Sequence, residues 1–248
     1  MIKIPISLQE LRQRIYQKAK AEPTHRFWGL FTHITNMTTL QEAYQHAKKN
    51  GGTSGIDGKG FADVEQEGVI SFLKSIQEEL RTGTYQPQAN RKIEIPKANG
   101  KMRTLQIPTI RYRVVQGALK LILEAIFEAD FCPNSYGFRP KRSPHQALAG
   151  VRRSVFRMTT VMDVDLSRYF DTIRHSILLE KIAKRIQDPQ VMHLIKQVIK
   201  AAGKLGVPQG ELCKALHNPP YAKKDTMQSK RQKARGHQEF VPFTFHSI

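Results

Sequence analysis

Cysteine is scarce in this sequence, with only Cys132 and Cys213 among its 248 residues. Two cysteines cannot form the disulfide framework of a small secreted domain, so the chain is expected to work in a reducing compartment, the cytoplasm. No apolar run approaches the roughly 18–20 residues that a membrane-spanning helix requires, and no membrane partner is expected. Residues 1–14 lack the apolar stretch that is typical of a secretory signal, so export is not expected either.

Acidic residues are also few: 21 Asp and Glu stand against 40 Lys and Arg, which gives a formal net charge of +19. Such an excess is typical of proteins that bind RNA, DNA or an anionic membrane surface, although a generally basic soluble protein is the alternative. The cations are clustered. Eight of them accompany one acid, Glu94, between residues 91 and 120, and six accompany none between residues 139 and 157. Since a solvated face usually mixes charge signs, this clustering favours nucleic acid.

Apolar residues at helical spacing predict a helix-rich fold with a few short strands. Residues 92–96 and 103–108 alternate like two strands, and the Asn99-Gly100 pair between them is a strong hairpin signal. The glycine-rich stretch 50–60 lacks the ending of a phosphate-binding P-loop, so a plain turn is favoured over a phosphate cradle. Helices are predicted at residues 7–22, 40–50, 61–82, 111–129, 145–157, 176–186 and 190–202.

Residues 159–166 are typical of a buried strand that carries Asp163 and Asp165 on one face, with Asp171 shortly after it. A buried carboxylate must be paired or bind a metal ion, and hard oxygen ligands suit Mg²⁺. Asp163 is expected to be exposed at the surface. Asp171 is expected to cap the helix that follows it. For Asp165 metal binding is favoured, as in the carboxylate sites that hold two ions for phosphoryl transfer.

The segment VDLSRYFDTIRH (164–175) resembles the first metal-binding motif of reverse transcriptases. Other segments follow the order of motifs in that family, and the N-terminal ones resemble bacterial group II intron-encoded reverse transcriptase/maturases. Several specific motifs in the right order argue against chance. These segments are SLQELRQRIYQKAKAEPTHRFWGL (7–30), GGTSGIDG (51–58), IPKANGKMRTLQIPTIRYRVVQ (95–116), NSYGFRPKRSPHQA (134–147) and GVPQG (206–210).

The resemblance implies an α+β fold, namely the fingers and an incomplete palm of a right-hand polymerase, helix-rich with a few short antiparallel strands. It implies an RNA-directed DNA polymerase with maturase association. The implied partners are RNA, a DNA primer and deoxynucleoside triphosphates, the implied cofactor is Mg²⁺, and the oligomeric state is left open. The implied division is an N-terminal extension (1–60), fingers (61–158), a partial palm (159–210) and a non-homologous tail (211–248) whose composition predicts a loop or disorder.

The resemblance also implies roles for the matched residues of the catalytic region. Asp165 would bind the catalytic Mg²⁺ ions, and Leu166 would help to hold one of them through its backbone carbonyl. Phe170 matches the ring that excludes a 2′-hydroxyl on the incoming nucleotide. Lys97 and Arg103, on the hairpin, match the two cations that hold the nucleotide triphosphate, where charge-assisted hydrogen bonds are strong.

Further matched residues are assigned to the nucleotide and to nucleic acid. Gln209 matches the polar residue that packs beside the nucleotide and the template. The sequence does not decide whether Arg111 and Arg113 contact a phosphate of the nucleic acid or only face the solvent. The cations assigned to nucleic-acid binding are Arg111, Arg113, Arg139, Lys141 and Arg142.

Three aromatic residues are open to a structural and a functional interpretation. For Tyr136 and Phe138, core packing and base stacking are equally favoured. Trp28 is expected to be a core residue of the N-terminal extension and not a platform for base stacking.

One motif of the family is missing from this sequence. A complete reverse transcriptase carries Tyr-x-Asp-Asp on a later strand hairpin, and these 248 residues contain no Asp-Asp pair. Because two-metal catalysis needs a second carboxylate from another strand, the chain is expected to be a truncated copy that cannot polymerise alone. The alternatives are a non-catalytic RNA-binding module retained from the fingers, and an unstable fragment whose Asp165 strand lies at an unpaired edge.

Overall fold

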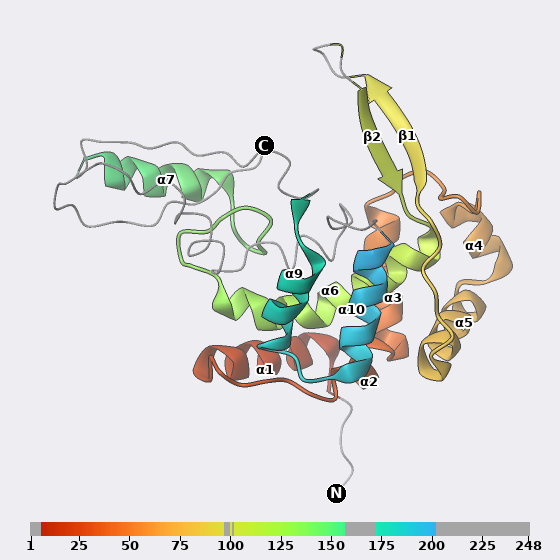
Figure 1. Ribbon diagram of the computed structural model, residues 1–248, viewed down its shortest axis with the longest axis horizontal. Coiled ribbons are helices and arrows are strands. Elements are labelled where there is room, and N and C mark those ends of the chain that lie inside the picture. Colours follow the sequence, from red (N-terminus) through yellow and green to blue (C-terminus); the bar gives the residue numbers. More distant parts are fainter. Residues whose placement is uncertain (1–5, 97–99, 101, 157–171, 202–248) are drawn as a thin grey trace, which may run out of the picture.

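The computed structural model describes residues 6–96, 100, 102–156 and 172–201, and Figure 1 shows a helical body from which one β-hairpin projects. The helix-rich α+β class expected from the sequence is confirmed. The elements are α1 (Leu8–Ala21), α2 (Leu30–Ile34), α3 (Met37–Lys49), α4 (Phe61–Glu67), α5 (Val69–Thr82), β1 (Arg91–Pro96), β2 (Met102–Ile107), α6 (Ile110–Asp130), α7 (Pro144–Val155), α9 (His175–Ala183) and α10 (Pro189–Lys200).

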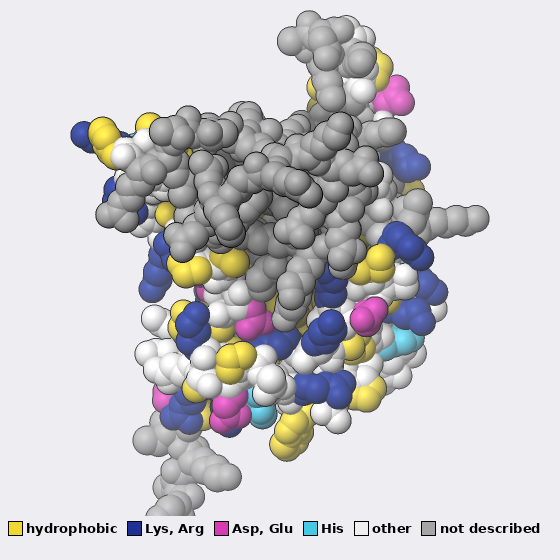
Figure 2. Space-filling view, turned by 60° about the vertical axis from the view of Figure 1, so that its left-hand side comes forward, with side chains coloured by type: hydrophobic (Ala, Val, Ile, Leu, Met, Phe, Trp, Pro, Cys, Tyr) yellow, Lys and Arg dark blue, Asp and Glu magenta, His cyan; other side chains and the backbone are white. Residues whose placement is uncertain are grey.

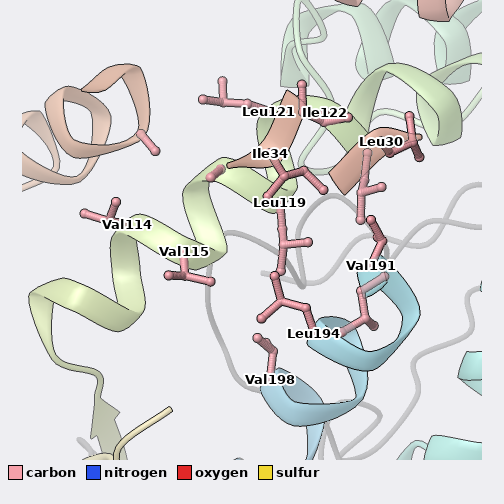
Figure 3. Close-up of a cluster of buried hydrophobic side chains, with 14 of the residues drawn as sticks. Leu30, Ile34, Val114, Val115, Leu119, Leu121, Ile122, Val191, Leu194 and Val198 are labelled. Carbon is pink, nitrogen blue, oxygen red and sulfur yellow. The ribbon is translucent and has the colours of Figure 1, made fainter. Parts of the chain in front are cut away.

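Helix α6 forms the centre of the helical body. Fifteen of its 21 residues are buried, so most of the helix surface lies against the rest of the chain. Thr109 caps its N-terminus, because the Thr109 hydroxyl accepts a hydrogen bond of 3.2 Å from the backbone N–H of Tyr112. Helices α1, α2 and α3 pack against α6. In Figure 3, Leu119 of α6 lies among apolar side chains of α2 and α10, which are Leu30, Ile34, Val191, Leu194 and Val198.

The sequence predicts one helix over residues 61–82, and the structure has two helices there, α4 and α5. The prediction missed the break between them. The two helices meet at Gly68, which is the C-cap of α4 and the N-cap of α5. Gly68 has a φ of 101°, a backbone conformation that residues with a side chain rarely adopt. Apolar residues continue at helical spacing on both sides of Gly68, so the periodicity did not reveal the break.

Strands β1 and β2 form the predicted antiparallel hairpin. Their register pairs Arg91 with Ile107 at the base and Pro96 with Met102 towards the tip. Gly100 has a φ of 76°, which agrees with the Asn-Gly turn signal in the sequence. The hairpin extends away from the helices in Figure 1.

The N-terminal segment is fixed to a segment far along the chain, and we call residues 19–31 together with residues 185–188 the N-terminal junction. The backbone N–H of Phe27 donates to the carbonyl of Arg185 (2.8 Å), and the N–H of Gln187 donates to the carbonyl of Phe27 (2.7 Å). The buried carboxylate of Asp188 accepts one hydrogen bond from the N–H of Val191, which caps α10, and another from the N–H of Phe31 in α2. One side chain therefore joins the start of two helices.

Arg185 completes the junction and is almost fully buried, with 2% of its surface exposed. Its Nε atom lies 2.9 Å from a carboxylate oxygen of Asp130, the last residue of α6. Its terminal nitrogens donate to carbonyls at and beyond the end of α1, where a helix leaves carbonyls without partners. The acceptors are the carbonyls of Ala19, Glu22, Pro23 and His25.

Because two tyrosines are buried, we expect the free energy of unfolding to fall at alkaline pH. Burial raises the pKa of Tyr112 to about 12 and raises the pKa of Tyr85 above its ordinary value. Above about pH 10 the unfolded chain loses tyrosine protons that the folded chain keeps, so the free energy of unfolding falls as the pH rises. Each tyrosine contributes a slope of up to about 1.4 kcal/mol per pH unit.

Urea unfolding between about pH 9 and pH 12, the range over which these tyrosines titrate, measures this effect. In Tyr112→Phe the alkaline slope should be shallower by up to about 1.4 kcal/mol per pH unit. The variant also loses the hydrogen bond of 2.9 Å from the Tyr112 hydroxyl to the carbonyl of Val198, so slopes are compared and not absolute stabilities. Lysines titrate in the same range in both proteins. Equal slopes in the two proteins would contradict the prediction.

Candidate nucleic-acid interface

The structure places Arg103 on the hairpin and leaves the other predicted nucleotide and metal residues outside the described part. Position 103 lies in β2, directly opposite Ile95 of β1. In the sequence, Lys97 directly follows the last residue of β1. The predicted residues that lie outside the described part are Lys97, Asp165, Leu166, Phe170 and Gln209.

Arg111 contacts helix α5. Its guanidinium donates to the carboxylate of Glu79 (2.8 Å) and to the hydroxyl of Ser75 (2.9 Å), and it lies over the ring of Phe72 at 5.2 Å from the ring centre. These contacts join α5 to the first turn of α6. The charge of Arg111 is therefore already paired with a carboxylate of the same chain.

Arg113 contacts the glycine-rich loop. Its guanidinium donates to the carbonyls of Gly51, Thr53 and Pro108. Burial lowers the pKa of Arg113 from its ordinary value, and the carboxylate of Asp57 partly offsets this effect. An arginine stays charged in proteins, so the side chain holds the loop by charge-assisted hydrogen bonds.

The glycine-rich loop packs against the start of α6. A Cβ atom at Gly55 would lie 2.6 Å from the Cα of Thr109, the N-cap of α6, so this position has no room for a side chain. Close packing of this kind accounts for a glycine at this position without any ligand. The packing agrees with the plain turn favoured from the sequence.

Arg139 is buried within the chain, with 8% of its surface exposed. Its guanidinium forms a forked ion pair with the carboxylate of Glu128 in α6, with Nη2 at 2.7 Å and Nε at 3.1 Å from Oε1. Its Nη1 atom donates to the carbonyls of Cys132 and Ser135, both at 2.7 Å. Arg139 therefore ties the loop after α6 back to α6.

The loop that Arg139 holds presents Phe138, Lys141 and Arg142 to solvent. Phe138 and Lys141 have φ values of 54° and 58°, in the left-handed region that costs a residue with a side chain roughly 1–2 kcal/mol. Such strain persists only where neighbouring contacts impose it, and here Arg139 supplies those contacts. The result is an exposed aromatic ring within four positions of two exposed cations.

Tyr136 packs within the chain, whereas Phe138 does not. The Tyr136 hydroxyl lies close to Gly150 of α7, since a Cβ atom there would be 3.1 Å away, and Arg142 lies over the Tyr136 ring at 5.6 Å. Of the two interpretations left open by the sequence, packing fits Tyr136. The exposed ring of Phe138 is available for stacking.

Helix α7 adds two exposed cations, Arg152 and Arg153, and a stripe of exposed apolar side chains that the sequence reasoning did not single out. Within residues 136–156, which we call the basic segment, the sequence contains no Asp or Glu. Figure 2 shows Lys and Arg side chains spread over the described part of one face of the molecule. Cations beside exposed rings can bind phosphates and stack on bases. The apolar stripe consists of Leu148, Val151, Val155 and Phe156.

Two further features of the described residues concern membranes and metal ions. None of the helices that they form is long and apolar enough to span a bilayer. They also contain no cluster of three or more His, Cys, Asp or Glu side chains that could hold a metal ion, and the predicted ligands Asp165 and Leu166 lie outside them.

Known proteins resemble this chain over most of its length. Protein YkfC of Escherichia coli is 36% identical over 225 residues, which cover 84% of this chain and 59% of YkfC. The group II intron-encoded protein LtrA of Lactococcus lactis is 34% identical over 191 residues, which cover 76% of this chain and 31% of LtrA. A putative COX1/OXI3 intron 2 protein of Saccharomyces cerevisiae is 28% identical over 190 residues, which cover 72% of this chain and 22% of the yeast protein. The chain thus spans about three-fifths of YkfC and about a third of LtrA.

A family model described as reverse transcriptase (RNA-dependent DNA polymerase) matches residues 95–224. The match begins near the end of β1, includes β2, the basic segment and the position of Asp165, and runs beyond Gly210. The resemblance drawn from the sequence motifs is confirmed: this chain belongs to the reverse transcriptase family, and its relatives include group II intron-encoded proteins.

Proposed function

We propose that this chain supplies the RNA-binding and nucleotide-binding fingers of an RNA-directed DNA polymerase of the group II intron type, with maturase association. The observation that carries the proposal is the projecting β-hairpin, within which the family match begins; its strand β2 carries Arg103, and in the sequence Lys97 directly follows β1. Two cations at the tip of a hairpin suit a triphosphate, whose charge they offset. The exposed cations of the basic segment suit an RNA backbone.

The catalytic residues are part of the same proposal. Asp165 offers a carboxylate and Leu166 a backbone carbonyl, and these hard oxygen ligands suit Mg²⁺. Bound Mg²⁺ would supply positive charge to the triphosphate at that position. Phe170 would exclude a 2′-hydroxyl, and Gln209 would contact the nucleotide and the template.

RNA binding is tested by fluorescence anisotropy of a labelled single-stranded RNA at several salt concentrations. The double variant Lys141→Asn/Arg142→Gln should bind more weakly, and its slope of log affinity against log salt should be smaller by about two. Asn is used at Lys141 because it tolerates the left-handed backbone. The control is Lys49→Ala in α3, which removes an exposed cation elsewhere and should leave the slope unchanged. A double variant with the wild-type slope would contradict the role of the basic segment.

A non-catalytic RNA-binding module is the second candidate, because the exposed cations of the basic segment suit an RNA backbone whether or not the chain is an enzyme. Primer extension with Mg²⁺ and four deoxynucleoside triphosphates separates the two candidates. The chain alone is expected to give no extension, because two-metal chemistry needs a second carboxylate. Robust extension that Asp165→Ala abolishes would establish the polymerase and refute the module.

A further inference from the structure

Trp28 is exposed, contrary to the core position expected from the sequence. Its side chain has 77% of its surface in contact with solvent, whereas Phe27 before it and Leu30 after it are buried. Trp28 is also the only tryptophan of the chain. A large aromatic ring gains free energy when it leaves water, so an exposed ring on an ordered segment offers a contact to a partner.

The backbone on both sides of Trp28 is fixed by the N-terminal junction. Phe27 is hydrogen-bonded through its N–H and its carbonyl to the 185–188 segment. On the other side, the N–H of Phe31 donates to Asp188 at 3.0 Å. Arg185 holds the carbonyl of His25. Because the backbone is already ordered, a partner would lose little conformational entropy when it binds the ring.

The charges around Trp28 suit a polyanion. Phe27 forms a β-bridge with Ile186 and is buried, whereas its neighbours Arg26 and Trp28 are both exposed. Two acids of the N-terminal junction are already engaged: Glu22 pairs with Lys18, and Asp188 accepts two backbone hydrogen bonds. An exposed ring with a cation two residues away offers stacking for a base and a contact for its phosphate.

This position is remote from the hairpin. Trp28 directly precedes the N-cap of α2, and in Figure 1 α2 lies at the bottom of the helical body while the hairpin projects at the top. We propose that Trp28 and Arg26 form a stacking platform for single-stranded RNA, a second RNA contact separate from the hairpin and the basic segment. The proposal rests on the proposed function only in requiring that the chain binds RNA.

The fluorescence of Trp28 tests the proposal directly, because no other tryptophan contributes to the signal. Full-length chain is titrated with a single-stranded RNA oligonucleotide while tryptophan emission and the anisotropy of a labelled copy are recorded. Stacking should quench Trp28 and protect it from acrylamide as binding saturates. Saturated anisotropy with unchanged Trp28 emission would overturn the platform and leave the proposed function standing, whereas no binding in either signal would overturn both.

Variants separate stacking from charge. Trp28→Leu should weaken RNA binding about tenfold, since stacking on an aromatic side chain contributes about that factor per base, while the salt slope stays as in the wild type. Trp28→Phe should restore most of the affinity. Arg26→Ala should reduce the salt slope by about one. Wild-type affinity in Trp28→Leu, with folding checked by circular dichroism, would overturn the proposal.

Discussion

Replacing Arg185 by alanine is expected to lower the free energy of unfolding by about 3–5 kcal/mol. The guanidinium is buried and lies 2.9 Å from the carboxylate of Asp130. Its removal leaves that carboxylate in a buried position without its partner charge, and it also leaves the carbonyls around the end of α1 without donors. The loss should therefore exceed the cost of an ordinary surface substitution several times over.

Urea unfolding of the full chain measures the effect, with Arg153→Ala as the control. Arg153 is an exposed arginine of α7, and its replacement should change the free energy of unfolding by less than about 0.5 kcal/mol. Arg185→Lys should fall between the two variants, because lysine keeps the charge but cannot donate to several carbonyls at once. If the two alanine variants had the same free energy of unfolding, Arg185 would not stabilise the junction and the prediction would be wrong.

The dependence on pH gives this prediction a second signature. Burial raises the pKa of Asp130, and the charge of Arg185 partly offsets that effect. In Arg185→Ala the offset is gone, so the pKa of Asp130 should rise further. A folded-state pKa above the unfolded one means that stability is lost as the pH rises through the interval between the two values. The stability deficit of Arg185→Ala should therefore shrink on acidification, and the added substitution Asp130→Leu should recover part of it at neutral pH.

Periodicity and turn signals predicted the local elements because their causes are local. The apolar spacing of α6 and the Asn-Gly turn of the hairpin are each set within one segment. The N-terminal junction has no such signal, since its acceptors are backbone carbonyls and its two segments are far apart in the chain. Arg185 stands in the sequence KRIQDP, where nothing marks it as buried.

The charge count shows that the protein is basic, but it does not show which of the Lys and Arg side chains are exposed to solvent. Arg111 and Arg139 are paired with Glu79 and Glu128, acids that other helical positions bring beside them. A window that contains no acid in the sequence can therefore contain paired cations in the fold. Lys141 and Arg142 are exposed, and they keep the role that the sequence assigned to them as a proposal.

Arg139 and its neighbours give the sharpest contrast between a structural and a nucleic-acid role. Arg139→Ala should lower the free energy of unfolding by about 3–5 kcal/mol, because it leaves the partly buried Glu128 without its partner and removes the donor to two loop carbonyls. The left-handed backbone of Phe138 and Lys141 loses its support at the same time. Hydrogen exchange of residues 131–143 should accelerate accordingly.

Arg139→Lys distinguishes the two roles of this cation. If Arg139 served as a solvent-facing phosphate contact, lysine would preserve both stability and RNA affinity. Because Arg139 instead makes a forked pair with Glu128, lysine should still destabilise the chain while the salt slope of RNA binding stays at the wild-type value. Lys141→Asn/Arg142→Gln should show the reverse, with little change in stability and a smaller salt slope. Wild-type stability with a reduced salt slope in Arg139→Ala would contradict this division, and it would return Arg139 to the role suggested by the charge count.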